Sequence, residues 1–224
     1  MQIEIKQLQK HFRHHQVLTD INLTVQQGTC VGILGANGCG KSTMLSILAG
    51  VQSPDGGQFL SDGVDLFQNP RMRNRLVGYV PQGTPLIEEL SARDNLLLWY
   101  DRKNMQQQLE NGVLKMLGVD EFLKVPVNKM SGGMKKRLSI GCAMASHPPV
   151  LLLDEPTAAL DLACKQSIAA WLRQYKQEGG ILLLTTHDVM ELELCDQWYI
   201  MKNGVLEPFV YDGDVSRLVA RLCV

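Results

Sequence analysis

The stretch from Gly35 to Thr43 has the composition and spacing of a phosphate-binding loop. It reads Gly-Ala-Asn-Gly-Cys-Gly-Lys-Ser-Thr and matches the pattern G-x-x-x-x-G-K-[ST]. Glycines at these positions let consecutive backbone N–H groups turn inward around phosphate oxygens, while Lys41 supplies positive charge and the Ser42 hydroxyl a magnesium ligand. We therefore expect a nucleotide and Mg²⁺ to bind here. The expected contact residues are Gly35, Asn37, Gly38, Cys39, Gly40, Lys41, Ser42 and Thr43.

The residues that flank this loop place it at a turn from a strand to a helix. Residues 30–34 form a short apolar run typical of a buried strand, and residues 43–49 have helical composition. This is the context in which the motif binds phosphate, so a plain glycine-rich turn is the less favoured interpretation. Cys39 lies inside the loop, where a thiol of lowered pKa would be reactive.

Two adjacent carboxylates, Asp154 and Glu155, follow a second buried strand at residues 150–153. In open α/β sheets, ligands bind at the carboxyl ends of the strands. Asp154 is suited to hold Mg²⁺ directly or through water, and Glu155 to polarise a water towards the terminal phosphorus. The predicted chemistry is in-line attack of water on the γ-phosphoryl group of ATP, stabilised by Lys41, the loop amides and Mg²⁺.

Two further polar side chains are expected at the same edge of the sheet. His187 follows the apolar run at residues 181–186, from which it could reach the γ-phosphate or orient the attacking water. Gln82 follows a short strand at residues 77–80 and could contact metal-bound water, so we count it with the candidate magnesium residues. The candidate catalytic residues are Glu155, His187 and Lys41, and the candidate metal residues are Ser42, Gln82 and Asp154.

A second anion site is predicted where a helix begins at Ser131. Ser131, Gly132 and Gly133 combine an N-cap serine with free backbone N–H groups. The helix is expected to run to about Ser146 and to end before Pro148. A segment of helical patterning at residues 83–129 separates this site from the phosphate loop.

The other segments predict an α/β scaffold. Alternating and apolar runs predict strands within residues 1–30, with a polar loop over residues 10–15, a hairpin over residues 58–66 and a second hairpin with an Asn-Gly turn over residues 198–206. We expect one domain, in which residues 1–82 and about 148–224 form the catalytic core with its β-subdomain. Residues from about 83 to 147 form a helical subdomain that carries Ser131.

Composition narrows the function classes. The chain has 224 residues, of which 45% are hydrophobic and 20% charged, with a net charge of −1. These values exclude disordered and fibrous classes and show no global positive field for nucleic acid, which is not an expected partner. No apolar run reaches eighteen residues and the N-terminus alternates like a strand, so we expect a cytosolic chain unless another protein holds it at a membrane.

The six cysteines lack zinc-type spacing and are expected to be small buried hydrophobes in a reducing compartment. They are Cys30, Cys39, Cys142, Cys164, Cys195 and Cys223.

Taken in chain order, these motifs resemble the nucleotide-binding subunit of ABC transporters over essentially the whole chain. The matching segments are Gly35–Thr43, Tyr79–Gln82, Met130–Met134, Leu151–Thr157, Ala159–Asp161 and Thr185–His187. The resemblance implies an α/β P-loop NTPase with a RecA-like core sheet, an N-terminal antiparallel β-subdomain and a helical insertion. It also implies that Gln82 is the Q-loop glutamine, Asp161 the D-loop aspartate and His187 the switch histidine. Phe12 would stack on the adenine of ATP.

The resemblance further implies a head-to-tail dimer, homomeric or heteromeric. Each ATP would lie between one subunit's phosphate loop and the other subunit's Ser131-Gly132-Gly133, which agrees with the anion site inferred above. The transport path would lie in membrane-spanning permease subunits that dock beside Gln82 and residues 85–100, with this chain peripheral on the cytoplasmic face of the cell membrane. Residues 96–100 are apolar and are expected to be packed core rather than an exposed docking surface.

The signature departs from the family's commonest form, Leu-Ser-Gly-Gly-Gln, because Met130 and Met134 flank Ser131-Gly132-Gly133. Met134 followed by residues 135–137 is similar to the branch that energises exporters of drugs, lipids and polysaccharides, which favours export. The basic run at residues 135–137 is otherwise expected to be a solvated helix face.

Two alternative functions remain at this point. One is a soluble ABC-type ATPase that acts outside transport, which usually has two cassettes, a long coiled-coil insertion or a basic surface, none of which this sequence shows. The other is a nucleotide-gated regulator without turnover, against which Glu155 and His187 argue.

Overall fold

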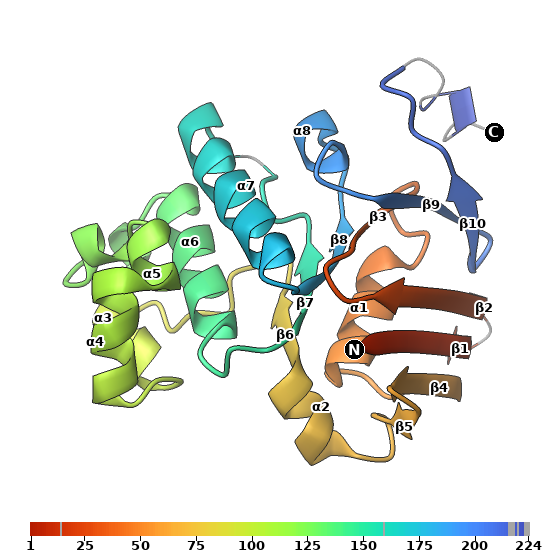
Figure 1. Cartoon of the computed structure of the whole chain (residues 1–224), viewed down its shortest axis with the longest axis horizontal. Helices are drawn as coiled ribbons and strands as arrows, with labels where there is room; N and C mark the ends of the chain where they lie inside the picture. The colour runs from red at the N-terminus through yellow and green to blue at the C-terminus, as the bar shows by residue number, and fades with distance from the viewer. Residues whose placement is uncertain (14, 159, 215–217, 219, 222–224) are drawn as a thin grey trace.

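The chain is described by a computed structural model that covers residues 1–13, 15–158, 160–214, 218, 220 and 221. Within these residues ten strands form one sheet in the order β5-β4-β1-β2-β10-β9-β3-β8-β7-β6 (Figure 1). The strands are β1 (Gln2–Phe12), β2 (His15–Gln26), β3 (Cys30–Leu34), β4 (Gly56–Ser61), β5 (Val64–Asp65), β6 (Val77–Val80), β7 (Val150–Asp154), β8 (Ile181–Thr185), β9 (Gln197–Lys202) and β10 (Val205–Phe209).

The sheet has a parallel half and an antiparallel half. Strands β9, β3, β8, β7 and β6 are parallel neighbours, whereas β2, β1, β4 and β5 pair antiparallel. Every residue of β3, β7 and β8 is buried, as expected for parallel strands covered on both faces. The predicted α/β class with a core sheet and an N-terminal antiparallel β-subdomain is confirmed.

The helices occupy both faces of the parallel strands and one end of the molecule. They are α1 (Lys41–Ala49), α2 (Pro70–Leu76), α3 (Ala92–Leu97), α4 (Arg102–Asn111), α5 (Val113–Met116), α6 (Gly132–Ala143), α7 (Leu162–Gln177) and α8 (Val189–Leu192), with short 3-10 helices η1 (Val119–Phe122) and η2 (Val127–Lys129). Figure 1 shows α3, α4 and α5 grouped with α6 at the end opposite the antiparallel strands. No helix in the described part of the chain is both long and apolar enough to span a membrane.

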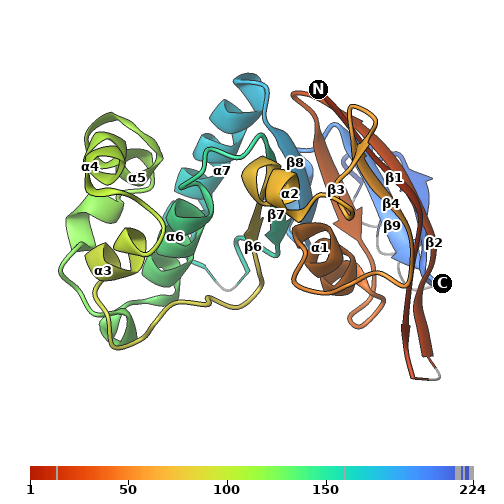
Figure 2. The ribbon, with the colours of Figure 1, turned by 90° about the horizontal axis from the view of Figure 1, so that it is seen from below.

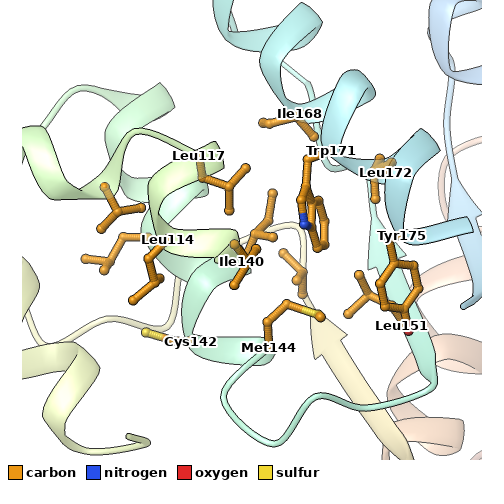
Figure 3. Close-up of a cluster of buried hydrophobic side chains, with 14 of the residues drawn as sticks. Leu114, Leu117, Ile140, Cys142, Met144, Leu151, Ile168, Trp171, Leu172 and Tyr175 are labelled. Carbon is orange, nitrogen blue, oxygen red and sulfur yellow. The ribbon is translucent and has the colours of Figure 1, made fainter. Parts of the chain in front are cut away.

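Alternate residues of the parallel strands supply the two larger hydrophobic cores of the described part of the chain. Leu152 and Leu183 pack with α1 and the antiparallel strands, so α1 lies between the two halves of the sheet (Figure 2). Leu151 and Leu184 face the other way and pack with side chains of α6 and α7. Figure 3 shows Trp171 of α7 in this second cluster, together with side chains of α5, α6 and β7. The second core therefore joins the helical end of the molecule to the parallel strands.

Several element boundaries differ from those expected. The predicted loop over residues 10–15 is mostly strand, because β1 reaches Phe12 and β2 begins at His15, with irregular register between Ile5 and His11. The helix after Ser131 ends at Ala143 rather than about Ser146, ahead of His147, whose φ is 47°. Helix α2 was not predicted, although Asn69 caps it and Pro70 occupies its first turn.

The apolar run at residues 96–100 is only partly core, which corrects the expectation. Leu96 and Tyr100 are buried, and the Tyr100 hydroxyl donates a hydrogen bond to the Gly141 carbonyl oxygen at 2.7 Å. Leu98 and Trp99 are instead 58% and 67% exposed. Helix α3 ends at Leu97, so the run does not continue as one buried helix face.

Candidate functional site

The phosphate loop lies between β3 and α1, as predicted. Gly35 has a φ of 150°, and a Cβ there would lie 2.6 Å from the Met201 carbonyl oxygen and 2.7 Å from Cys39 Sγ. A side chain is therefore excluded by the backbone conformation and by the available space. Lys41 Nζ donates hydrogen bonds to the carbonyl oxygens of Gly35, at 2.6 Å, and Ala36, at 3.1 Å, so the lysine arches back over its own loop.

A cavity of about 410 Å³ brings this loop together with three polar side chains from distant parts of the sequence. Its lining residues are Asn37, Gly38, Gly40, Lys41, Ser42, Thr43, Gln82, Glu155 and His187. Strands β3, β6, β7 and β8 are neighbours in the sheet and all end at this edge. The convergence of Gln82, Glu155 and His187 on the phosphate loop follows from that strand order.

Asp154 is not among the described residues that line this cavity, and it is held by a residue that the sequence interpretation did not identify. The aspartate is 3% exposed, and its Oδ1 accepts a hydrogen bond of 2.6 Å from Thr185 Oγ1. The same hydroxyl oxygen accepts a 3.1 Å hydrogen bond from the Glu155 backbone N–H. Asp154 and Thr185 are partners in the β7–β8 register, which could have been inferred by aligning the two apolar runs.

Glu155 is contacted at both carboxylate oxygens by residues predicted to act with it. Gln82 Nε2 donates to Oε2 at 3.1 Å, and His187 Nε2 lies 3.7 Å from Oε1. The backbone of Glu155 has a φ of 47°, which a residue with a side chain rarely adopts. Strained backbone of this kind is concentrated at functional sites, where it aims a side chain.

The residues at this edge of the sheet are suited to bind a nucleoside triphosphate with Mg²⁺. Within the described residues, no group of three or more His, Cys, Asp or Glu could hold a metal ion unaided. Magnesium is usually held by one or two carboxylates together with substrate phosphates and water. Asp154 and the Ser42 hydroxyl would hold it on that basis, whereas Gln82 already donates to Glu155.

A larger cavity of about 580 Å³ adjoins the phosphate loop on the side of Cys39. The two cavities share Gly38, and the larger one is also lined by His15, Val17 and the turn between β9 and β10. Phe12 is not among the described residues that line either cavity. It is 45% exposed, and Lys10 Nζ lies 5.4 Å from its ring centroid.

The predicted second anion site lies apart from the phosphate-loop cavity. Ser131 caps α6 by accepting a 3.2 Å hydrogen bond from the Met134 N–H, and Asp161 caps α7 by accepting one of 2.9 Å from the Cys164 N–H. The Cys164 thiol donates to the Gly133 carbonyl oxygen at 3.9 Å, which joins the two helix starts. None of the described residues that line the cavity belongs to this group. Ala159, part of the matching segment before Asp161, lies outside the described residues.

Lys136 departs from the expected solvated helix face. It is only 4% exposed, and its Nζ donates to the carbonyl oxygens of Pro81, at 3.0 Å, and Gln82, at 3.1 Å. Its neighbour Lys135 is half-buried, and its Nζ lies 3.5 Å from a carboxylate oxygen of the exposed Glu88. Lys136 lies four residues before the buried Ile140 and therefore on the same face of the helix. This spacing could have predicted that Lys136 is buried.

Four of the cysteines are buried as expected: Cys30, Cys142, Cys164 and Cys195. Burial raises the pKa of the Cys142 thiol to about 12, which disfavours the reactive thiolate. Cys39 is half-buried in the phosphate loop. Cys223 lies outside the described residues.

Comparisons show that this chain is similar to known ATP-binding proteins of transporters. A family model described as "ABC transporter" matches residues 18–158. The chain is 35% identical to a sulfate/thiosulfate import ATP-binding protein of Neisseria meningitidis, with 92% of this chain and 60% of that protein covered. It is 34% identical to a probable sulfate/thiosulfate import ATP-binding protein of Chlorella vulgaris, with 91% and 89% covered. The chain thus spans about three fifths of the length of the Neisseria relative.

Two solved structures share the fold. The ATP-binding subunit of an ABC transporter superimposes with a TM-score of 0.87 at 26% identity, with both chains fully covered. A dimeric ATP-binding cassette in a post-hydrolysis state, bound to ADP and Pi, superimposes with a TM-score of 0.82 at 27% identity, with 92% of this chain and 96% of that chain covered.

Proposed function

This chain belongs to the ABC transporter family, and on that premise we propose that it binds and hydrolyses ATP to drive a membrane transporter. The observation that carries the proposal is the convergence of Gln82, Glu155 and His187 with the phosphate loop on one cavity. A cavity that combines a phosphate cradle, a carboxylate base and two orienting side chains is suited to attack on a terminal phosphoryl group.

In the proposed reaction, the loop amides and Lys41 bind the phosphates of ATP. Lys41 Nζ already lies over the loop, where it would exchange backbone carbonyl partners for phosphate oxygens. Magnesium, held by Ser42 and Asp154, would neutralise charge on those oxygens. Thr185 supports this arrangement because its hydroxyl fixes the Asp154 carboxylate.

Glu155 is the proposed general base, and it would accept a proton from the attacking water. Gln82 and His187 lie at opposite oxygens of its carboxylate, so they would hold the base in one orientation. Holding a base and its water in a near-attack geometry lowers the entropic part of the barrier. The remaining predicted contacts, from the signature and from Asp161, would come from a second copy or a paralogous subunit.

The separation of Ser131 and Asp161 from the phosphate-loop cavity supports this dimeric arrangement. A helix start capped by Ser131 presents free N–H groups to an anion, yet its own phosphate loop lies elsewhere. A head-to-tail dimer would bring it to the partner's ATP. The dimeric cassette with which this chain shares its fold is consistent with that proposal.

The proposed partner is a membrane-spanning permease, which would hold this chain at the cytoplasmic face of the cell membrane. Ile87, Leu98 and Trp99 are exposed hydrophobic residues of the region in which docking was predicted. Exposed apolar side chains of this size are typical of interaction surfaces. The signature of this chain favoured export, but the relatives are named as importers and give that direction no support. Import and export of a labelled solute by vesicles that contain both subunits would decide the direction.

The Glu155→Gln variant tests the proposed hydrolysis. Removal of the base should lower ATP turnover by about 100-fold or more while ATP binding persists. Steady-state phosphate release and equilibrium ATP binding are the two measurements. Glu193→Gln, at an exposed glutamate that follows α8, is the matched control and should turn over ATP as the unmodified protein does. Unchanged turnover in Glu155→Gln would remove Glu155 as the base, and binding without any turnover in the unmodified chain would favour a regulator.

A further inference from the structure

We propose that Lys136 is a positioning residue for ATP hydrolysis, which holds the segment after β6 so that the Gln82 amide stays on the Glu155 carboxylate. The inference rests on the proposed ATPase function and assigns a role in it to a side chain of helix α6. No role was expected for this lysine beyond a solvated surface.

The contacts form a continuous path from α6 to the proposed base. Lys136 Nζ donates to the carbonyl oxygens of Pro81 and Gln82 at 3.0 and 3.1 Å. The side chain of the same Gln82 donates through Nε2 to Glu155 Oε2 at 3.1 Å. Gln82 itself is exposed and lies outside any helix or strand, so its backbone lacks the ladder of hydrogen bonds that fixes β6. The ammonium group therefore supplies a constraint that secondary structure does not.

The burial of Lys136 indicates that these contacts are specific. The side chain is 4% exposed, and a buried ammonium group is costly unless it is paired and hydrogen-bonded. Burial lowers the pKa of Lys136, while the carboxylates of Asp154, Glu191 and Glu155 act in the opposite direction and favour its charged form. The carboxylates at the end of β7 and on α8 therefore favour the charged form of Lys136, whereas its direct hydrogen bonds go to the segment after β6.

Lys136 links the segment after β6 to the start of helix α6. Ser131 caps this helix, and Lys136 follows about one turn later on the same rigid element. A displacement of the helix start would therefore move the carbonyl partners of Lys136, and with them the Gln82 amide. A movement of Ser131-Gly132-Gly133 would in this way change the contact between Gln82 and the proposed base, Glu155, of the same subunit.

Lys136→Met tests the proposal because it keeps most of the side-chain volume and removes the charge and the donors. We expect kcat for ATP hydrolysis to fall about 10- to 100-fold, since small misplacement of reacting groups has effects of this size. KM for ATP should change less than about 3-fold, because the phosphate loop is untouched. Lys135→Met is the matched control, because the half-buried Lys135 pairs with Glu88 and not with the segment after β6, and it should leave both constants unchanged. Lys136→Arg, which retains charge and donors, should recover part of the lost kcat.

A double-mutant cycle with Gln82→Ala separates positioning from general destabilisation. If Lys136 acts through Gln82, the two losses in kcat should be strongly non-additive, so that the double variant is no slower than Gln82→Ala alone. Additive losses, or a kcat in Lys136→Met equal to that of the unmodified chain, would overturn the proposal. Should Lys136→Met fail to fold, Lys136→Gln takes its place in the cycle.

Hydrogen exchange gives a readout that does not require turnover. Backbone amides of residues 82–84 should exchange faster in Lys136→Met than in Lys135→Met, because the segment loses its anchor. Equal exchange in the two variants would contradict the tether even if ATP hydrolysis fell. Conversely, faster exchange in a chain that never hydrolyses ATP would locate the failure in the proposed function and not in the contact.

Discussion

At Glu155, the proposed base, three neighbours hold a residue whose backbone conformation is unfavourable. A φ of 47° on a non-glycine residue costs on the order of 1–3 kcal/mol, which other contacts must offset. The Glu155 N–H donates to both the carbonyl and the hydroxyl oxygen of Thr185, each at 3.1 Å. Gln82 and His187 then lie against the carboxylate. The backbone turn directs the carboxylate into the cavity, and the two side chains restrict its rotation.

Thr185 is the residue for which the structure makes the clearest new prediction. Thr185→Val keeps the shape of the side chain but leaves the buried Asp154 Oδ1 without its hydroxyl donor. We expect ATP turnover to fall about 10- to 100-fold, the usual effect of removing a hydrogen bond that orients a metal-binding residue. Steady-state phosphate release over a range of Mg²⁺ concentrations is the measurement. Thr185→Ser restores the hydroxyl and should retain most of the activity; equal losses in both variants would assign the effect to packing.

At the scale of elements, the ends of neighbouring strands and the starts of helices position the residues of the proposed site. Strands β7 and β8 deliver Asp154, Glu155 and His187 to one edge because their residues pair in parallel register. Helix α6 begins at the capping residue Ser131, and its Lys136 side chain is hydrogen-bonded to the segment after β6. Helix α8 is short, yet it carries a buried carboxylate next to this edge.

Glu191 of α8 should make the stability of the fold depend on pH. It is 4% exposed, and burial raises the pKa of its carboxyl group. Because the unfolded chain releases this proton at lower pH, the contribution of Glu191 to stability is present below its unfolded pKa of about 4.5 and is lost as pH rises through the folded value. Glu191→Gln, which has no such proton, should gain stability relative to the unmodified chain between pH 5 and pH 8. Urea midpoints at the two pH values test this, with the exposed Glu193→Gln as control; a pH-independent difference would contradict it.

At the scale of the whole molecule, the residues of the proposed ATP site fall into two separate groups. The phosphate loop follows β3, whereas Ser131 and Asp161 start α6 and α7 and are joined to each other by Cys164 and Gly133. The core shown in Figure 3 packs α6 and α7 against the parallel strands. This packing keeps the two groups of residues apart within one subunit, so in the proposed dimer a second subunit would complete the site.

Mixing two inactive variants tests whether the ATP sites are shared. Lys41→Ala damages the phosphate loop, and Ser131→Ala damages the signature, so each variant alone should lack most ATP turnover. In a head-to-tail heterodimer, one site carries both defects and the other carries neither. We therefore expect mixing to restore activity towards one intact site for each heterodimer, measured by phosphate release after exchange of subunits. No recovery, with heterodimers demonstrated by tagged pull-down, would contradict the shared site.

The local elements of the phosphate loop and of the buried strands could be predicted because their signals are local. The glycine spacing from Gly35 to Gly40 specifies a backbone that other residues cannot follow, and runs such as residues 150–153 are apolar enough to require burial on both sides. Boundaries were less accurate where tertiary contacts extended or ended an element, as in the β1–β2 hairpin, where His11 and Lys10 are held by Asp55.

The sequence alone therefore determined the chemistry of the site: a phosphate loop, a carboxylate pair, a glutamine, a histidine and a capped glycine-rich helix start, all in an order typical of one family. Only the tertiary structure decided which of these meet. It placed Gln82 and His187 on Glu155, left Phe12 and Ser131 away from the cavity, and buried Lys136 against the segment after β6. The physical reason is that residue type and spacing specify local backbone and charge, whereas the distances between strand ends and helix faces depend on how the two hydrophobic cores pack.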